Sequence, residues 1–407
     1  MASIFDLKDW IKKNQKWPSK PPAELLKAFN STLEVPVSHQ LRIPYGISVN
    51  ELLKIALPLQ YMDDGPRNLA SLFVAEDPTC MSMSSLMALL VPGSPDIMNK
   101  LREEWKHAFL AGKTGFIDWR AFGKGQVYPP WVIAFWLEIF DAVSSHAAWT
   151  KSKAFLMRLA TEDNGSTYEF AQHTLQTFNK LIWHGSPQND ILQWELNSRQ
   201  DFSILLSHQM LPQRLVNALL HVLSDRLNKS GIEQVKVYLI EVMDKLRGNG
   251  GGRIDWVTYK LIPNDANHRW VWKLGDSFQE NKFRPIFLPI YLPPYHWSLY
   301  WVDLSSNSLH YGDSVSREAS DSDINIIKRW FGAHGFTLKF TGIFVIGKQV
   351  DSHSCGLVIV NAIEHAVLDV ALWSQENANA IRIQKYLDIC MLESNNMSTT
   401  VILINHN

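Results

Sequence analysis

The chain is organised around the segment Lys348-Gln349-Val350-Asp351-Ser352-His353-Ser354-Cys355-Gly356, which leads into the apolar run Leu357-Val358-Ile359-Val360. The run predicts a buried helix that begins at Cys355. A cysteine at a helix N-terminus gains from the helix dipole and from free backbone N–H groups, and both favour the thiolate. Gly356 lets the backbone pass close to a substrate. Gln349, six positions before the cysteine (355 − 349), can donate an N–H group to a developing oxyanion. A Cys-Gly pair alone would more often mark a buried cysteine at a helix start.

Length and composition describe a globular chain. Its 407 residues are enough for two or three domains, and 46% hydrophobic with 19% charged residues is a folding composition. The formal net charge of −1 gives no support for binding nucleic acid or an anionic membrane. The N-terminus carries charges inside any apolar core, so it does not fit a signal peptide. The sequence has no uncharged apolar run of about 18 residues, so no membrane span is predicted.

The three cysteines, Cys80, Cys355 and Cys390, lie far apart in the sequence. Such spacing fits neither a disulfide framework nor a metal quartet. It predicts a reducing compartment, so we expect an intracellular protein of the nucleus or cytoplasm. We expect no metal and no cofactor. Cys390 fits a core position.

Residues 1–195 are predicted to form a mostly helical domain of unknown function. Residues 96–109 have a helical apolar period, and Pro129-Pro130 opens a helix that is apolar almost all round. A linker is expected at 159–167 and a further helix at 168–183, with the domain boundary near 195. The histidines of this half (His107, His146 and His173) show no ligand spacing.

Residues 196–407 are predicted to form an α+β domain with a central mixed sheet, helices on both sides and the Cys355 helix packed through its middle. Strands 296–303 and 308–312 form a hairpin around the turn at 305–307. His296 begins one strand and Asp313 follows the other, so both lie at the same end of the hairpin. Further elements are expected as a helical pair at 202–227 broken at Pro212, helices at 235–246 and 320–331, and strands at 284–291, 336–340 and 342–346.

Together these residues form a possible nucleophile, base and carboxylate. Cys355 would attack a carbonyl as thiolate, His296 would take and return a proton, and Asp313 would hold the imidazole tautomer. Gln349 and the backbone N–H of Cys355 would form the oxyanion hole. His353, beside the nucleophile, fits a loop residue because His296 already fills the role of base.

The set resembles the SUMO-specific (ubiquitin-like-protein) cysteine protease family, in the clan of the adenovirus protease. The matching pieces are His296-Trp297-Ser298-Leu299, Tyr311-Gly312-Asp313-Ser314, Gln349 six before Cys355-Gly356, and Leu288-Pro289-Ile290. The order His, Asp, Gln, Cys is not the papain order. The resemblance covers about 200–395 and implies a papain-like or adenain-like fold.

Two departures from the family pattern stand out. The family usually has Asp directly before the cysteine, where this chain has Ser354, and often Asn where this chain has Asp351. The family's first helix begins Trp-Leu-x-Asp, which aligns here with Met210-Leu211-Pro212-Gln213 and lacks both the Trp and the Asp. In the family that Trp covers the tunnel for the substrate's Gly-Gly tail. Trp297 would supply the other wall, and Met210 could pack over the tail as a flexible apolar side chain.

The resemblance implies a thiol isopeptidase or endopeptidase that cuts after the Gly-Gly tail of SUMO or a related ubiquitin-like modifier, in processing or deconjugation. Three alternatives stay open. The clan includes acetyl-transferring bacterial effectors, but the basic cluster that they need is not seen here. The chain could instead be a catalytically weak protease that binds a ubiquitin-like protein, or the protease accessory of a mobile-element-derived protein.

Overall fold

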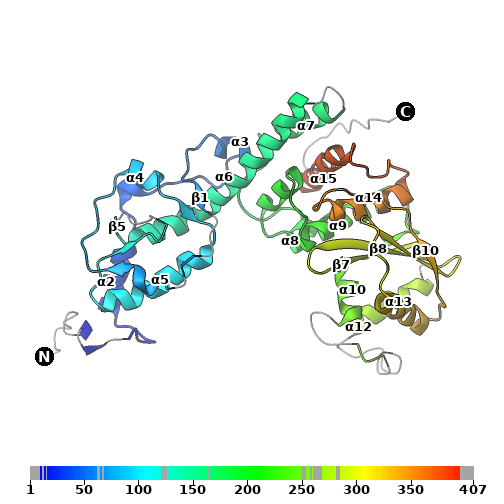
Figure 1. Ribbon diagram of the computed structural model, residues 1–407, viewed down its shortest axis with the longest axis horizontal. Coiled ribbons are helices and arrows are strands. Elements are labelled where there is room, and N and C mark those ends of the chain that lie inside the picture. Colours follow the sequence, from blue (N-terminus) through cyan, green and yellow to red (C-terminus); the bar gives the residue numbers. More distant parts are fainter. Residues whose placement is uncertain are drawn as a thin grey trace. The chain divides into compact units, whose positions relative to one another are not determined.

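The structure, a computed structural model, describes residues 10–11, 13–14, 16–61, 65–66, 68–120, 126–162, 166–248, 254–256, 259, 268–280 and 285–394. The chain divides into two compact units (Figure 1). The first comprises Met1–Thr150 with Ile182–His184, and the second comprises Lys151–Leu181 with Gly185–Asn407. The expected boundary at 195 therefore lies inside the second unit.

The difference in boundary has a physical reason. Helix α6 (Trp131–Glu162) runs without interruption through the division and through the start of the expected linker, whose residues 163–165 lie outside the described part. Beyond it, the second unit's helices contact the far end of the chain. The Thr177 and Tyr386 hydroxyls are 2.9 Å apart, and the Glu393 carboxylate accepts from the backbone N–H of Gln188 at 2.8 Å. The partners lie 209 and 205 residues apart in the sequence, so the residues around either partner do not predict the contact.

The first unit combines helices with two small sheets. Its helices are α2 (Ala23–Leu33), α3 (Val49–Leu52), α4 (Met83–Met87), α5 (Pro95–Leu110) and the first part of α6, with 3-10 turns η1 (Val37–His39) and η2 (Ala70–Leu72). Parallel strands β1 (Gln60–Tyr61) and β3 (Val91–Pro92) pair, as do antiparallel β2 (Phe73–Val74), β4 (Gly115–Ile117) and β5 (Val127–Tyr128). Strands of two or three residues are too short to show an alternating pattern, so the sequence did not predict them.

The second unit is built on a five-stranded mixed sheet of order β10-β9-β8-β7-β6. The strands are β6 (Lys236–Val237), β7 (Ile286–Leu292), β8 (His296–Asp303), β9 (Ser308–Asp313) and β10 (Lys339–Ile343). β7, β8 and β9 are antiparallel neighbours, whereas β6 and β10 join the two edges in parallel. Pro289 is tolerated in β7 because β6 pairs only with Ile286 and Phe287, which leaves that edge of β7 open beyond them.

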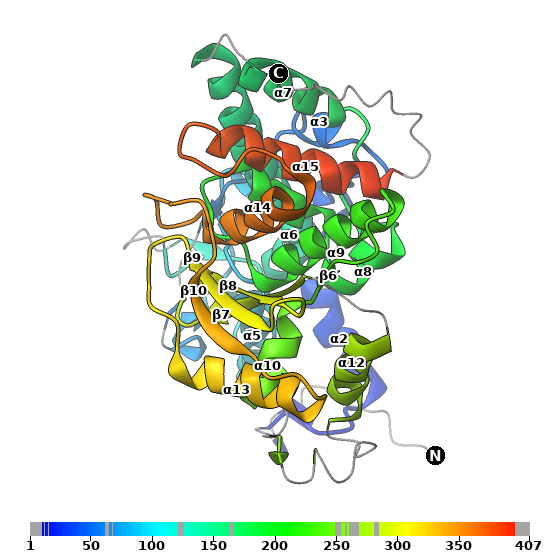
Figure 2. The ribbon, with the colours of Figure 1, turned by 90° about the vertical axis from the view of Figure 1, so that its right-hand side faces the viewer.

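Helices cover both faces of this sheet, as Figure 2 shows. α9 (Gln213–Lys229), α14 (Cys355–Leu368) and α15 (Ala378–Glu393) lie on one side, while α10 (Ile240–Arg247), α12 (Arg269–Glu280) and α13 (Asp321–Ala333) lie on the other. α7 (Ser166–Thr177), α8 (Asp190–Glu195) and the 3-10 helix η3 (Arg199–Leu206) complete the unit. α14 packs against the central strand β8 and against α9, and its first ten residues are all buried.

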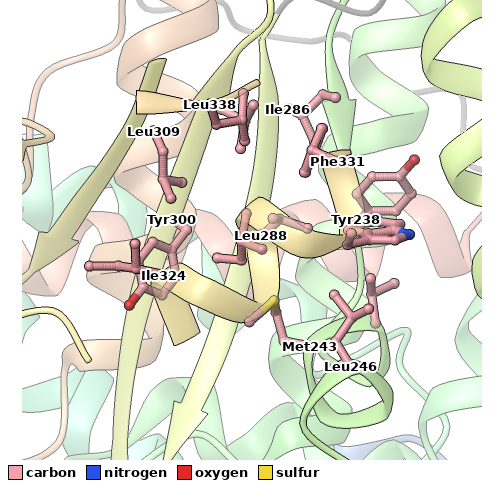
Figure 3. Close-up of a cluster of buried hydrophobic side chains, with 14 of the residues drawn as sticks. Tyr238, Met243, Leu246, Ile286, Leu288, Tyr300, Leu309, Ile324, Phe331 and Leu338 are labelled. Atoms are coloured by element: carbon pink, nitrogen blue, oxygen red, sulfur yellow. The ribbon is translucent and has the colours of Figure 1, made fainter. Parts of the chain in front are cut away.

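One face of the sheet carries a large hydrophobic core. Alternate residues of β7, β8 and β9 meet apolar side chains of α10, α12 and α13, and Figure 3 shows part of this cluster around Leu288 and Tyr300. Burial of these side chains stabilises the unit by about 1.5–3 kcal/mol for each large apolar residue. The hairpin that carries His296 and Asp313 is therefore held on a rigid base.

Some predicted elements differ from the observed ones. Residues 235–246 are not one helix, because Lys236 and Val237 pair with β7 before α10 begins. The expected strands 336–340 and 342–346 are the single strand β10, with a register shift where Gly342 takes φ 125°. The helix expected at 168–183 ends at Thr177. Among the described residues, no helix has the length and apolarity needed to cross a membrane.

Candidate active site

The β8–β9 hairpin brings His296 and Asp313 together. Ser298 of β8 pairs with Asp313 of β9. His296 lies two residues before Ser298, at the end of β8 that is next to Asp313. His296 Nε2 lies 2.7 Å from Asp313 Oδ2, and both side chains are buried. The proximity expected from the hairpin is therefore found.

Asp313 is held as a carboxylate by several donors. Its Oδ1 accepts from the backbone N–H groups of Val315 at 2.9 Å and Arg317 at 3.1 Å. The Tyr311 hydroxyl lies 3.1 Å from Oδ2. Burial acts to raise the pKa of Asp313, but the hydrogen bonds from His296 and these N–H groups outweigh it and lower the pKa. Asp313 thus stays ionised and fixes the orientation of the His296 ring.

Cys355 is the second partner of His296. It begins α14, is fully buried, and interacts electrostatically with the His296 ring. Because Nε2 faces Asp313, Nδ1 is the nitrogen left for the thiol. Burial acts to lower the pKa of His296, but hydrogen bonds and charge from Asp313 and Cys355 raise it to about 9. The imidazole is therefore protonated at neutral pH beside the buried Cys355.

Gln349 is anchored from both sides. Ser314 Oγ donates to Gln349 Oε1 at 2.8 Å, and the Gln349 backbone N–H donates to the Ser314 carbonyl at 3.1 Å. Gln349 Nε2 donates one of its two hydrogens to the Asp351 carbonyl at 3.0 Å. One side-chain N–H of Gln349 therefore remains to donate to a substrate oxygen.

Two of the expected substrate-binding residues, Trp297 and Gly356, lie against each other at the start of α14. Trp297 Nε1 donates to the Leu211 carbonyl at 3.2 Å, and its side chain is 1% exposed. A Cβ added to Gly356 would lie 3.1–3.3 Å from Val216, Trp297 and Leu211. The structure thus gives Gly356 an internal packing role. Met210 is partly buried, beside Leu211. The contacts of Trp297 and Met210 with a substrate stay predictions.

Four further residues support the site, although the sequence predicted no role for them: Tyr311, Ser314, Asp351 and Arg382. Tyr311 and Ser314 belong to the Tyr-Gly-Asp-Ser segment. Their position beside Asp313 in that segment is the sequence feature that could have identified them as site residues. Asp351 organises the loop before Cys355. Arg382 of α15 interacts electrostatically with Asp351 and Cys355, and only the packing of α15 brings it there.

Arg382 carries a buried positive charge. Its Nη1 donates to the carbonyls of Ile204 and Gln209 at 3.3 Å each, whereas its Nη2 has no hydrogen-bond partner in the described structure. Burial lowers the pKa of Arg382 to about 10.

His353 lies in the loop, as expected, and faces a second histidine. His353 Nε2 is 3.4 Å from His208 Nδ1, and His353 Nδ1 is 3.5 Å from Asp351 Oδ1. Burial lowers the pKa of both histidines, so they are neutral near pH 7. Within the described ranges, no group of three or more His, Cys, Asp or Glu side chains is arranged to hold a metal ion.

No family model matches the chain, and no curated protein matches it. Solved structures match about half of it. The C-terminal Ulp1 protease domain in complex with Smt3, the yeast ortholog of SUMO, is 17% identical, with 48% of this chain and 82% of that chain covered and a TM-score of 0.35. The Ulp1-like SUMO protease catalytic domain of Chaetomium thermophilum is 13% identical, with 49% and 81% covered and a TM-score of 0.35.

A bacterial structure is also similar. The Xanthomonas campestris effector XopD bound to ubiquitin is 18% identical, with 43% of this chain and 91% of that chain covered and a TM-score of 0.32. The site itself combines a cysteine at a helix start, a histidine between it and a buried carboxylate, and an amide donor nearby. This is the set of groups that acyl transfer through a thiol requires.

Proposed function

We propose that the second unit is a cysteine protease that cleaves after the C-terminal Gly-Gly of SUMO or a related ubiquitin-like modifier. The observation that carries the proposal is the buried set Asp313, His296 and Cys355, in which a 2.7 Å hydrogen bond joins the first two and the buried Cys355 interacts electrostatically with the His296 ring. The sequence motifs around these residues support the choice of substrate class. The solved structures of SUMO-bound Ulp1 and ubiquitin-bound XopD agree with it.

The reaction would proceed through a thioester. The Cys355 thiolate attacks the carbonyl carbon of the terminal glycine, and the carbonyl oxygen becomes an oxyanion that accepts from Gln349 and from the backbone N–H of Cys355. The C–N bond then breaks, and His296 gives its proton to the leaving amine. His296 next takes one proton from water, which attacks the thioester carbonyl. The C–S bond breaks, the thiolate leaves, and the modifier's new carboxylic acid loses its proton to solvent.

The burial of Cys355 fits a substrate with no side chains at the cut site. The thiol is fully buried, and Gly356 is packed against Leu211, Val216 and Trp297. An extended chain of glycine residues can pass closer to such a surface than any residue with a β-carbon. This favours a Gly-Gly tail over other peptide sequences.

The test uses the full chain and its Cys355→Ala variant. Each is mixed with SUMO, NEDD8 and ubiquitin that carry a C-terminal electrophile, and the intact mass is read. We expect one adduct on the wild type, none on Cys355→Ala, and one modifier to react fastest. No adduct on a folded wild-type chain with any of the three would overturn the proposal. Binding of a modifier without an adduct would instead favour the alternative of a catalytically weak ubiquitin-like-protein binder.

A further inference from the structure

We propose that Tyr311 is a positioning residue whose hydroxyl shares the Asp313 carboxylate with His296 and so limits how strongly the imidazole holds its proton. The Ser298 hydroxyl supports Tyr311 from the neighbouring strand. The inference rests on the proposed function, because it concerns the same imidazole as the acid that protonates the leaving amine. It gives a role to two buried hydroxyl groups that do not themselves take part in the proposed reaction.

One oxygen of the Asp313 carboxylate has two hydrogen-bond partners. His296 Nε2 lies 2.7 Å from Oδ2, and the Tyr311 hydroxyl lies 3.1 Å from the same atom. The other oxygen, Oδ1, already accepts from the backbone N–H groups of Val315 and Arg317. His296 and Tyr311 therefore draw on the negative charge of a single oxygen. A carboxylate that is stabilised by a further donor is a weaker base toward its other partner.

The second contact of Tyr311 determines where its hydrogen points. The Tyr311 hydroxyl also lies 3.1 Å from Ser298 Oγ, and each hydroxyl has one hydrogen to donate. If the Tyr311 hydrogen pointed at Ser298, the Tyr311 oxygen would face the ionised Asp313 oxygen with no hydrogen between them. The carboxylate is also the stronger acceptor. The hydrogen bonds therefore run from Ser298 to Tyr311 and from Tyr311 to Asp313.

The β8–β9 hairpin holds these three side chains together. Ser298 pairs with Asp313 across the two strands, and Tyr300 pairs with Tyr311. Paired residues of antiparallel strands lie on one face of the sheet, and residues two apart on a strand share that face. Ser298 is fully buried, and Tyr311 and Asp313 are buried as well. Bulk solvent therefore does not compete for their hydrogen bonds.

The surroundings of Tyr311 keep its hydroxyl protonated. The titratable and charged groups that face it are Asp313 on its own strand, Tyr300 of β8, and Asp323 of α13, which is paired with Arg247 of α10. Burial and the charges of Asp313 and Asp323 raise the pKa of Tyr311 to about 12. Tyr311 thus remains a donor over the pH range in which His296 loses its proton. The groups that act on His296 are Asp313 and Cys355.

Loss of the Tyr311 hydroxyl should make His296 more basic. Asp313 Oδ2 would then have His296 as its remaining side-chain donor, and its charge would stabilise the imidazolium more strongly. A more basic imidazole is a weaker acid toward a leaving amine. Tyr311 therefore favours release of the proton from His296 while leaving the Asp313 carboxylate in place to orient the ring.

The first test measures the pKa of His296 in the full chain without any substrate. Histidine is labelled with ¹³C at Cε1, the chain is titrated by NMR, and the His296 signal is assigned by its absence in His296→Gln. We expect Tyr311→Phe to raise the pKa by about half to one pH unit, the effect of losing one ordinary hydrogen bond. Ser298→Ala should raise it by less, because Tyr311 keeps its hydrogen but loses the donor that polarises it.

Tyr300→Phe is the matched control. It removes a hydroxyl from the same buried core, and among the described residues no hydrogen bond joins this hydroxyl to Asp313. The pKa of His296 should therefore stay unchanged in Tyr300→Phe. If Tyr311→Phe does not fold, Ser298→Ala tests the same direction of change from the other end of the hydrogen-bonded chain.

The second test is the pH profile of cleavage of a modifier with a Gly-Gly amide reporter. In Tyr311→Phe the alkaline limb of kcat/KM should move to higher pH with the pKa, while kcat near neutral pH falls by about threefold because the acid is weaker. A loss of structure that loosened the contact between His296 and Asp313 would move the limb to lower pH, since it would weaken the charge that holds the proton.

The outcomes separate this inference from the proposed function. A wild type that cleaves no reporter, but whose His296 pKa rises in Tyr311→Phe, would overturn the proposed function and support the shared carboxylate. An active wild type whose His296 pKa is unchanged or lower in Tyr311→Phe would overturn the role of Tyr311 alone. An equal rise in Tyr300→Phe would also overturn it.

Discussion

In the proposed reaction, proton transfer would depend on the His296 imidazole, which lies between Asp313 and Cys355. Burial on its own would lower the pKa of His296, but Asp313 and Cys355 raise it to about 9. At neutral pH the imidazole is therefore protonated and can deliver its proton to a leaving amine. Above that pKa it becomes neutral and the acid is lost.

We therefore expect kcat/KM for an amide-linked Gly-Gly substrate to fall as the pH rises through about 9. Asp313→Asn removes the negative charge that raises the pKa, so the alkaline limb should move to lower pH. The measurement is the pH profile of both enzymes between about pH 6 and 10.5, with iodoacetamide alkylation as control, since alkylation needs no general acid. An alkaline limb that Asp313→Asn leaves in place would contradict the pairing.

Ser314 should act through Gln349. Its hydroxyl fixes the amide by donating to Gln349 Oε1 at 2.8 Å. Ser314→Ala should lower kcat about threefold to tenfold with little change in KM, and Gln349→Ala about a hundredfold, because only the latter removes a donor. Ser314→Thr keeps the hydroxyl and serves as the matched control. Equal kcat values for Ser314→Ala and Ser314→Thr would rule out this role.

At the scale of elements, the position of α14 depends on two kinds of contact. Its N-terminus lies close to Trp297 of β8 and to Val216 of α9, because Gly356 has no side chain. Its middle is tied to α15 by a buried ion pair between Glu364 and Lys385, and Lys385 also donates to Asp388 at 3.1 Å. The first contact sets the distance of the thiol from the sheet, and the second holds the helix against its neighbour.

Gly356→Ala should cost about 1–3 kcal/mol of folding free energy through overpacking, because the new methyl group meets three side chains at 3.1–3.3 Å. The same shift should displace Cys355 and slow its reaction with a modifier electrophile. Gly332→Ala in α13, where an added Cβ meets nothing within 4 Å, is the control. Urea unfolding of the three proteins measures the effect, and equal midpoints for both variants would refute it.

Lys385→Ala should destabilise the protein by about 3–5 kcal/mol, because it leaves the buried Asp388 without a cation and Glu364 with only Arg226, at 3.7 Å. The exposed pair Lys229–Asp225 provides the comparison, and Lys229→Ala should change stability by less than about 1 kcal/mol. Thermal and urea unfolding distinguish the two. A Lys385→Ala protein as stable as Lys229→Ala would show that the buried pair adds nothing.

At the scale of the whole molecule, the three cysteines should differ in reactivity. Cys80 is exposed, and Cys355 lies beside His296. Cys390 is buried, and burial raises its pKa to about 12. A modifier electrophile should label Cys355 alone, a small alkylating reagent Cys80 and Cys355, and neither should label Cys390 before unfolding. Peptide mapping after each reaction provides the readout. Early labelling of Cys390 would contradict its burial.

The sequence by itself determined the local pieces of the site. The hairpin that joins His296 to Asp313 follows from alternation and a turn, and the start of α14 follows from the apolar run after Cys355. These features depend on residues close in sequence, which is why pattern and spacing predict them.

Only the tertiary structure decided which distant residues pack against these local segments of the site. It placed the helices at 166–195 with the C-terminal unit, brought Arg382 toward Cys355, packed Gly356 against Trp297 and turned Ser354 toward Asp351. An apolar period predicts that one face of an element is buried, but it does not identify the distant side chains that pack against that face. A serine before a helix predicts a cap, and a competing carboxylate decides whether the cap forms.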